Sequence, residues 1–293
     1  MNQPTNIFWN QKEIEDQPID IFWNRRRKTF LSIGIALLYL ITMLLVGLLL
    51  RPESYGVNYN AKFIPPCLKH PFGTDYMGRD MFFRSVKGLS NSIVIGILAS
   101  IVSSLVALIF GVAAAMKGGP IDGLVNWCVD LCMGIPHIIL LILISFMFGR
   151  GGKGVMIAVA LTHWPELTRL VRAEVLQIRS SQYVQASYRM GKTKFQVAKS
   201  HMFPQVLPVF LVGVVLLFPH AIMHEAAITF LGFGFSAEVP AIGVILSESM
   251  KHIASGKWWM AVFPGIMLLL AVLLFDLVGE NLKRLLNPNS GNE

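Results

Sequence analysis

A single apolar stretch carries three side chains that could do chemistry inside a membrane. His220, His224 and Glu225 lie within the run from about 206 to 230, where they would sit near mid-membrane. Histidines four residues apart share one face of a helix, and imidazole suits borderline transition metals. Ionisable groups within membrane spans are rare and often functional. The spacing therefore predicts a shared metal ion or a substrate pathway, and packing against neighbouring helices is the structural alternative.

Two motifs that would make this chain an enzyme are missing from its sequence. Ile228 stands where the second histidine of the zinc-protease pattern His-Glu-x-x-His would be. The glycine-rich turn at 149–154 is similar to a phosphate loop in composition only, because Ser or Thr does not follow its Gly-Lys pair. We therefore expect no catalytic residue and no cofactor bound by this chain. Any ATP-Mg that drives the protein would be used by separate subunits.

The composition is that of a membrane protein. Of its 293 residues, 54% are hydrophobic and 14% are charged, whereas a soluble domain carries about 25% charged residues. The mean hydropathy is +0.58. A net charge of +8 fits basic loops that face anionic lipid, and no aromatic-basic motif indicates nucleic acid. The three cysteines, Cys67, Cys128 and Cys132, do not have the spacing of a disulfide framework.

Six apolar runs predict an all-α membrane protein with six transmembrane helices. The fourth is the weakest, because only 12 residues separate its start near Gly154 from Glu166, and Pro165 predicts a kink. The membrane domain covers 30–286, between an N-terminal cytoplasmic segment (1–29) and a cytoplasmic tail (287–293). The expected spans are about 30–50, 90–116, 126–148, 154–170, 206–230 and 258–279.

Basic residues predict the orientation of these spans. The cluster at 25–28 places the N-terminus in the cytoplasm, and six spans return the C-terminus to the same side. The segment 169–199 carries seven Lys or Arg residues against Glu174 alone, so it also lies inside. The expected outer loops are 51–87, 149–153 and 233–257.

The segment 183–208 is a polar, helix-forming insert between two apolar runs. Ala186 and Ser187 are small enough to let another surface approach, and Gly191 permits a sharp turn between two short helices. Pro204 and Pro208 then lead the chain into the next span. This pattern predicts a helical elbow that fits a groove on a soluble partner, and an ordinary basic loop is the alternative.

The insert resembles the Glu-Ala-Ala loop of permease subunits of binding-protein-dependent ABC importers. It differs from that pattern at four positions, including His201 and Phe203. The resemblance implies the type I ABC importer permease fold, in which an EAA-type coupling-helix loop contacts the ATPase in the cytoplasm. The implied coupling residues are Gln185, Ala186, Ser187, Gly191 and Pro204.

A second, independent segment points to one branch of that family. The stretch 70–80 resembles the His-Pro-Leu-Gly-Thr-Asp-x-x-Gly-Arg-Asp signature of the second permease in dipeptide, oligopeptide and nickel importers. The segment 229–234 and the pair Asn287-Pro288 are further echoes of that group. In physical terms, Thr74 or Asp75 can cap a short helix, and the other residues can form turns and ion pairs in an outer lid. The implied periplasmic-gate residues are Gly73, Thr74, Asp75, Gly78, Arg79 and Asp80.

The resemblance also implies partners and a substrate. It implies a non-enzymatic subunit of the inner membrane, in lipid and without nucleic acid, beside a homologous second permease, two ATP-binding subunits and an extracytoplasmic substrate-binding protein. Nickel permeases similarly place two histidines four apart before the Phe-Leu-Gly segment, which favours nickel or a metal chelate. Di- or oligopeptides are the alternative substrate. An ion-coupled secondary transporter is more remote, because Glu225 is the only carboxylate clearly deep in a span.

Overall fold

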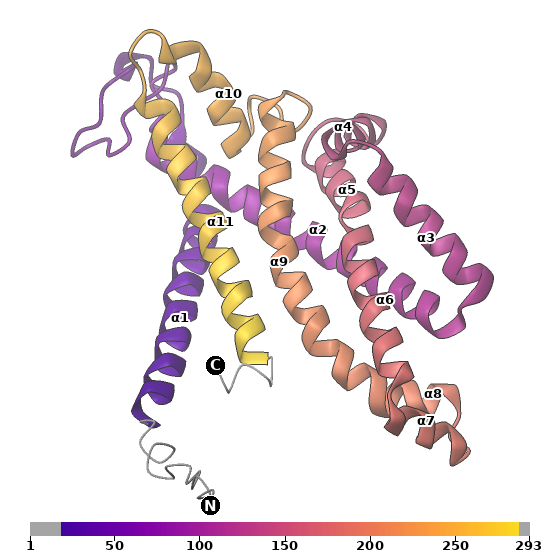
Figure 1. Ribbon diagram of the computed structural model, residues 1–293. Coiled ribbons are helices and arrows are strands. Elements are labelled where there is room, and N and C mark those ends of the chain that lie inside the picture. The colour runs from indigo at the N-terminus through magenta and orange to yellow at the C-terminus, as the bar shows by residue number, and fades with distance from the viewer. Residues whose placement is uncertain (1–18, 287–293) are drawn as a thin grey trace, which may run out of the picture.

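The computed structural model describes residues 19–286, and four long helices form the body of that part (Figure 1). Each is long and apolar enough to cross a membrane. Residues 1–18 of the predicted N-terminal segment (1–29) and the predicted tail 287–293, with the Asn287-Pro288 pair, lie outside the described residues. The four helices are α1 (Ile19–Leu49), α2 (Met81–Lys117), α9 (Phe203–Phe230) and α11 (Trp259–Leu286).

The third predicted span is broken in two. α3 (Gly119–Gly134) and α4 (His137–Met147) meet at a bend of 98°, where the sequence led us to expect one helix over 126–148. Pro136 explains the break, because a proline disfavours the helical conformation of the residue before it. Ile135 accordingly has extended angles, φ −94° and ψ 135°.

The fourth predicted span is also a pair of helices, α5 (Gly152–Thr162) and α6 (Trp164–Ser180). Pro165 has no N–H to donate, and its ring would clash with the carbonyl of Leu161 in a continuous helix, so the break at His163 follows. By length and composition, the described residues hold four helices that could cross a membrane, or five if α3 and α4 form one span, which is approximately consistent with the predicted six.

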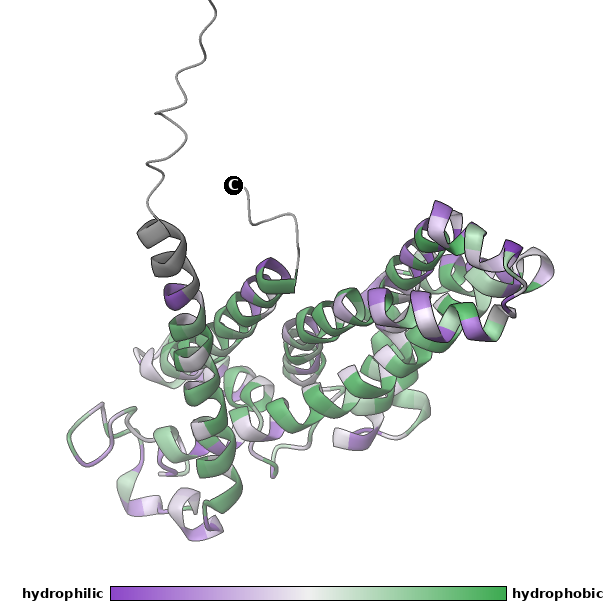
Figure 2. Cartoon of the chain, turned by 90° about the horizontal axis from the view of Figure 1, so that it is seen from below, coloured by the Kyte–Doolittle hydropathy of each residue, from purple (hydrophilic) through white to green (hydrophobic). Residues whose placement is uncertain are grey.

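α2 lies at the centre of the bundle, against α1, α6 and α9. Small residues allow these close approaches, as in other membrane bundles. A Cβ at Gly111 of α2 would lie 2.8 Å from the Val171 side chain of α6. Large apolar side chains such as Leu38 and Trp127 face outward, and Figure 2 shows hydrophobic residues along most of the helices. Such a surface suits contact with lipid.

At one end of the bundle the chain forms an elbow, which we define as 182–202. It contains α7 (Gln182–Arg189), α8 (Lys194–Val197) and the π-helical turn η4 (Ala198–Met202). Gly191 makes the turn after α7 with φ +82°, which confirms the predicted sharp bend. η4 runs directly into α9, so 195–230 forms one helical stretch.

At the opposite end, an irregular loop joins α1 to α2 and contains the short turns η2 (Pro52–Tyr55) and η3 (Tyr59–Ala61). The helix α10 (Ile242–Ile253) lies beside it and leads into α11 (Figure 1). The start of the described part of α1 and the end of α11 both lie toward the elbow end of the bundle (Figure 1).

Candidate functional site

The loop before α2 is built around one buried carboxylate, Asp75. Its side chain is fully buried and accepts hydrogen bonds from the backbone N–H groups of Met77 at 2.8 Å and Arg79 at 2.9 Å. Two guanidinium groups also donate to Asp75 Oδ2: Arg79 through Nε at 2.6 Å and Arg84 through Nη1 at 3.1 Å. A buried carboxylate needs such a shell, because its charge would otherwise be strongly destabilised.

Glu248 of α10 completes this network across more than 160 residues of sequence. Its Oε2 atom lies 2.7 Å from Arg84 Nη1 and 3.1 Å from Arg79 Nη2. Although burial opposes the charge, Asp75 and Glu248 raise the pKa of Arg79 above its usual value. The Tyr76 hydroxyl donates to Glu248 Oε1 at 3.3 Å, and burial and the Glu248 charge raise the pKa of Tyr76. We give the name ion-paired loop to the set Asp75, Tyr76, Arg79, Arg84 and Glu248. Their contacts join the segment before α2 and the first turn of α2 to α10.

The cap of α2 differs from the expectation that Thr74 or Asp75 would cap a helix. Asp80 is the N-cap residue, and its Oδ1 accepts from the backbone N–H groups of Phe82 and Phe83. Its Oδ2 lies 2.7 Å from His70 Nδ1. Thr74 instead uses its hydroxyl to donate to the Ala61 carbonyl, because residues 74 and 80 pair across the turn and the helix starts only after them.

The two glycines of this segment are required by the backbone. Gly73 and Gly78 have φ of +70° and +73°, a region that side chains disfavour. A Cβ at Gly78 would overlap the carbonyl oxygen of Asn58, and one at Gly73 would lie 2.6 Å from the carbonyl oxygen of Ile64. The predicted tight turns are therefore present. Next to them, an open pocket of about 360 Å³ is lined in part by Tyr76 and Glu238.

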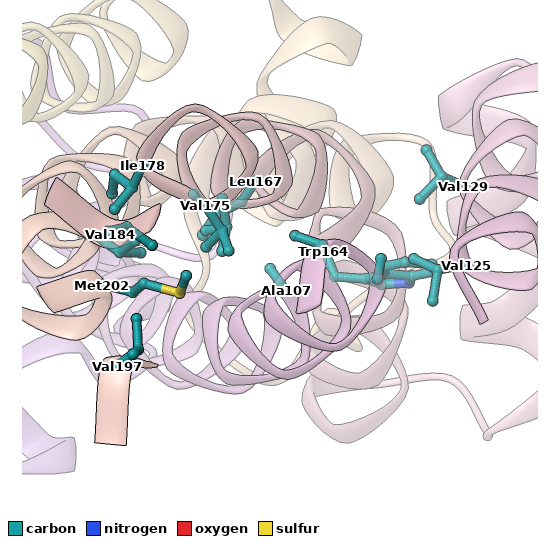
Figure 3. Packing of buried hydrophobic residues seen from close by; sticks show 14 residues of the cluster. Ala107, Val125, Val129, Trp164, Leu167, Val175, Ile178, Val184, Val197 and Met202 are labelled. Atoms are coloured by element: carbon teal, nitrogen blue, oxygen red, sulfur yellow. The ribbon is translucent and has the colours of Figure 1, made fainter. Parts of the chain in front are cut away.

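The elbow is held by an apolar cluster against α6. Figure 3 shows Val184 of α7, Val197 of α8 and Met202 of η4 gathered beside Ile178, and all four are buried. Ser187 is buried on the same side, where its hydroxyl donates to the Tyr183 carbonyl at 3.0 Å. Of the small residues predicted to face a partner, Ser187 thus packs inside the elbow.

The outer surface of the elbow combines exposed small, polar and apolar groups. Gln185 and Ala186 are exposed, and Gln185 Nε2 donates to the Arg179 carbonyl at 3.0 Å. Two large apolar side chains are also exposed, Met190 at 80% and Phe195 at 77%. Sequence reasoning did not single out either residue, although both flank Gly191 in a polar insert. Exposed apolar groups rimmed by polar ones are typical of a protein contact.

The chemistry-bearing residues of α9 separate into three environments. Glu225 is fully buried, and the Thr229 hydroxyl donates to its Oε1 at 2.9 Å. His220 is exposed, whereas His224 is half-buried and lies against two histidines from other helices. Sequence reasoning paired His224 with His220. Among the described residues, the structure groups it instead with His137, which begins α4, and His163, between α5 and α6.

Two ion pairs connect α3 to α6. Arg172 donates to both carboxylate oxygens of Asp122, at 2.6 and 2.7 Å, which is the favourable fork geometry of a guanidinium. Arg169 lies 2.5 Å from Asp130 on the exposed surface. Both pairs link the two broken spans to each other.

Comparison with known proteins gives one consistent result. The family profile described as "Binding-protein-dependent transport system inner membrane component" matches residues 103–289. The dipeptide transport system permease protein DppC of Bacillus subtilis (strain 168) is 32% identical over 86% of this chain and 79% of that protein. The oligopeptide transport system permease protein OppC of the same organism is 29% identical over 86% of this chain and 84% of that protein. The probable D,D-dipeptide transport system permease protein DdpC of Escherichia coli (strain K12) is 28% identical over 90% of this chain and 89% of that protein.

The fold is also similar to a solved structure. A chain of the MetNI methionine ABC transporter, in an inward-facing conformation, superposes with a TM-score of 0.56 and 20% identity. The match covers 71% of this chain and 98% of that chain. At this identity the likeness concerns the fold alone.

Proposed function

The chain belongs to the family of binding-protein-dependent transport system inner membrane components, as the second permease of the peptide group of ABC importers, and we propose that it passes di- or oligopeptides. The observation that carries the substrate class is the 32% identity to a dipeptide permease over 86% of this chain. The sequence alone favoured nickel or a metal chelate. The relatives reverse that order, because those described above are named for dipeptides or oligopeptides.

An ABC importer permease is a multi-pass membrane subunit that works with a partner permease, an ATPase and a substrate-binding protein. An ion-coupled secondary transporter does not fit this family. In our proposal the pore is a heterodimer with a homologous second permease, and two ATP-binding subunits hydrolyse ATP-Mg, while this chain binds no nucleotide cofactor of its own. Both termini and the elbow lie in the cytoplasm, which is supported by the basic segment 169–199.

The elbow is the proposed contact with an ATPase subunit. Its outer surface carries exposed Gln185 and Ala186, and the exposed side chains of Met190 and Phe195 supply apolar area for a groove on a soluble partner. Ser187 and the buried cluster beside Ile178 hold the elbow in shape, so a push on it is passed to α6 and α9. Gly191 and Pro204 set the turn and the start of α9.

The ion-paired loop is the proposed outer gate, close to where the substrate-binding protein delivers its cargo. It links residues before α2 to α10 through buried charges, so these two segments would move as one piece. His220, His224 and Glu225 of α9 stay proposed as residues along the substrate pathway. The exposed His220 is the most accessible of them.

Uptake by the complete transporter tests the substrate class. Vesicles that contain both permeases and the ATPases receive the binding protein with either a labelled dipeptide or radioactive nickel. We expect ATP-dependent accumulation of the dipeptide, and nickel at the level of vesicles with an inactive ATPase. Nickel accumulation without peptide accumulation would overturn the proposal. Reduced dipeptide uptake by a His220→Ala variant that inserts normally would support a place for this side chain on the pathway.

A further inference from the structure

Three histidines from three separate helical segments converge in the bundle. One ring nitrogen from each of His137, His163 and His224 lies within 4.8 Å of the others. Their ring centroids are 4.5 to 5.1 Å apart. Among the residues that the structure describes, this is the one group of three possible ligands that meets this distance. We call it the histidine cluster.

Two members of the histidine cluster owe their positions to breaks in membrane helices. His137 follows Pro136 at the bend between α3 and α4, and His163 precedes Pro165 at the join of α5 and α6. Non-helical backbone at membrane depth is tolerated where it is buried in protein or lines a cavity. Both breaks point their histidine toward the same place beside α9, where His224 lies.

The hydrogen bonds of His163 determine which of its nitrogens is free to bind. Its Nδ1 lies 2.9 Å from the Val159 carbonyl oxygen, which can only accept, so Nδ1 carries the proton. Its Nε2 therefore has a lone pair, and that atom is buried without a hydrogen-bond partner. A metal-binding histidine commonly donates its other N–H to a backbone carbonyl in this way.

A second ring nitrogen in the cluster is also unsatisfied. Nε2 of His137 is buried and has no hydrogen-bond partner among the described residues. Leaving a buried polar atom without a partner is unfavourable, and two such atoms on rings whose centroids are 4.8 Å apart can be satisfied by one common partner. A cation that accepts lone pairs satisfies both atoms at once, whereas further packing satisfies neither.

The donor set selects the kind of cation. Three neutral imidazoles suit divalent zinc, cobalt, nickel or copper, whereas calcium and magnesium require oxygen ligands. The carboxylate of Glu225, the next residue after His224, accepts a hydrogen bond from Thr229 and is not part of the cluster. Zinc–nitrogen bonds of about 2.0–2.1 Å place tetrahedral ligands roughly 3.3 Å apart, so ring nitrogens that now lie up to 4.8 Å apart approach one another when they bind the ion.

We propose that His137, His163 and His224 form a binding site for one divalent transition-metal ion, held by three imidazole nitrogens. A three-histidine site leaves at least one coordination position open. His137 and His224 are only half-buried, so the open position faces the accessible side of the cluster. The site depends on the fold of one chain and not on the choice of peptide as the transported substrate.

Cobalt binding tests the site directly. The purified transporter is stripped with a chelator and titrated with Co²⁺ alone, whose visible absorption reports a tetrahedral nitrogen environment, and Zn²⁺ is then added in competition. We expect one tightly bound Co²⁺ that depends on the histidine cluster. Each of His137→Gln, His163→Gln and His224→Gln should weaken binding by about 100-fold or more, since even loss of an indirect partner costs roughly 10–100-fold.

His220→Gln is the matched control, because His220 lies one turn before His224 on the same helix and outside the cluster. It should bind Co²⁺ like the unchanged protein. Assembly of each variant with its partner subunits is checked by gel filtration. If His163→Gln does not assemble, the test relies on the variants at the half-buried positions 137 and 224. The proposal is overturned by absence of stoichiometric Co²⁺, by binding that survives all three substitutions, or by equal losses in His220→Gln and His224→Gln.

Discussion

Replacing Gly191 with valine should strain the elbow turn and nothing else. Gly191 has φ +82°, and a Cβ added there would meet no atom within 4 Å. The penalty therefore comes from the backbone alone, and a left-handed conformation costs a residue with a side chain roughly 1–2 kcal/mol. That energy corresponds to a shift of roughly 5–30-fold away from the native turn.

Uptake and ATP hydrolysis, measured side by side in vesicles, show the consequence. If the elbow transmits the ATPase motion, Gly191→Val lowers the amount of dipeptide accumulated per ATP by up to the same roughly 5–30-fold. The amount of permease inserted in the membrane should not change, because the substituted position is exposed and contacts no neighbouring helix. Quantitative blotting of the vesicles checks this point.

Two matched variants separate strain from position. Gly191→Asn should keep most of the coupling, since asparagine tolerates the left-handed region. Gly149→Val places the same residue at φ +86°, also with no atom within 4 Å, in the turn between α4 and α5. Its coupling should stay normal. Normal uptake per ATP in Gly191→Val, or an equal loss in Gly149→Val, would refute the coupling role of the elbow.

Three further predictions concern the stability of the loop before α2, each measured by denaturant titration of the detergent-solubilised transporter. Asp75→Asn should lower the free energy of unfolding by about 3–5 kcal/mol, because it leaves the buried Arg84 without its full countercharge; a loss below about 1 kcal/mol would contradict the central role of this carboxylate. Asp80→Ala removes the cap of α2 and should cost about 0.5–2 kcal/mol, whereas Asp80→Asn should keep most of the capping energy. Gly78→Ala forces a Cβ onto the Asn58 carbonyl and should destabilise the loop more than Gly56→Ala, where the nearest atom is 3.4 Å away; equal effects would argue against this close approach as the cause.

Local sequence signals were sufficient for the elbow and for the turns before α2. Gly191 between two short polar helices and Gly73 and Gly78 in the 70–80 segment predict positive φ angles, and the structure has them. Proline rules foresaw the kink at Pro165. The same rules apply to Pro136, but the largely apolar composition of 126–148 favoured a single helix and masked the break.

Contacts between residues far apart in the chain could not be predicted from the sequence. Glu248 gives no local sign that it meets Arg79 and Arg84, because α10 packs on the loop only in the folded bundle. The partner of His224 was sought four residues away on the same helix, whereas the fold supplies His137 and His163 from two others. A histidine within two residues of a helix-breaking proline was the signal available for both.

The continuity of the helix from 195 to 230 has a mechanical consequence. Because the π-helical turn η4 joins the elbow to α9 without a flexible loop, the 36 residues behave as a lever roughly 54 Å long. A tilt of about 10° at its base swings the far tip by roughly 9 Å. Pro208 and Pro219 lie inside this lever, where each removes one backbone hydrogen bond. Substitutions that stiffen them would therefore alter the amplitude of the stroke without touching either end.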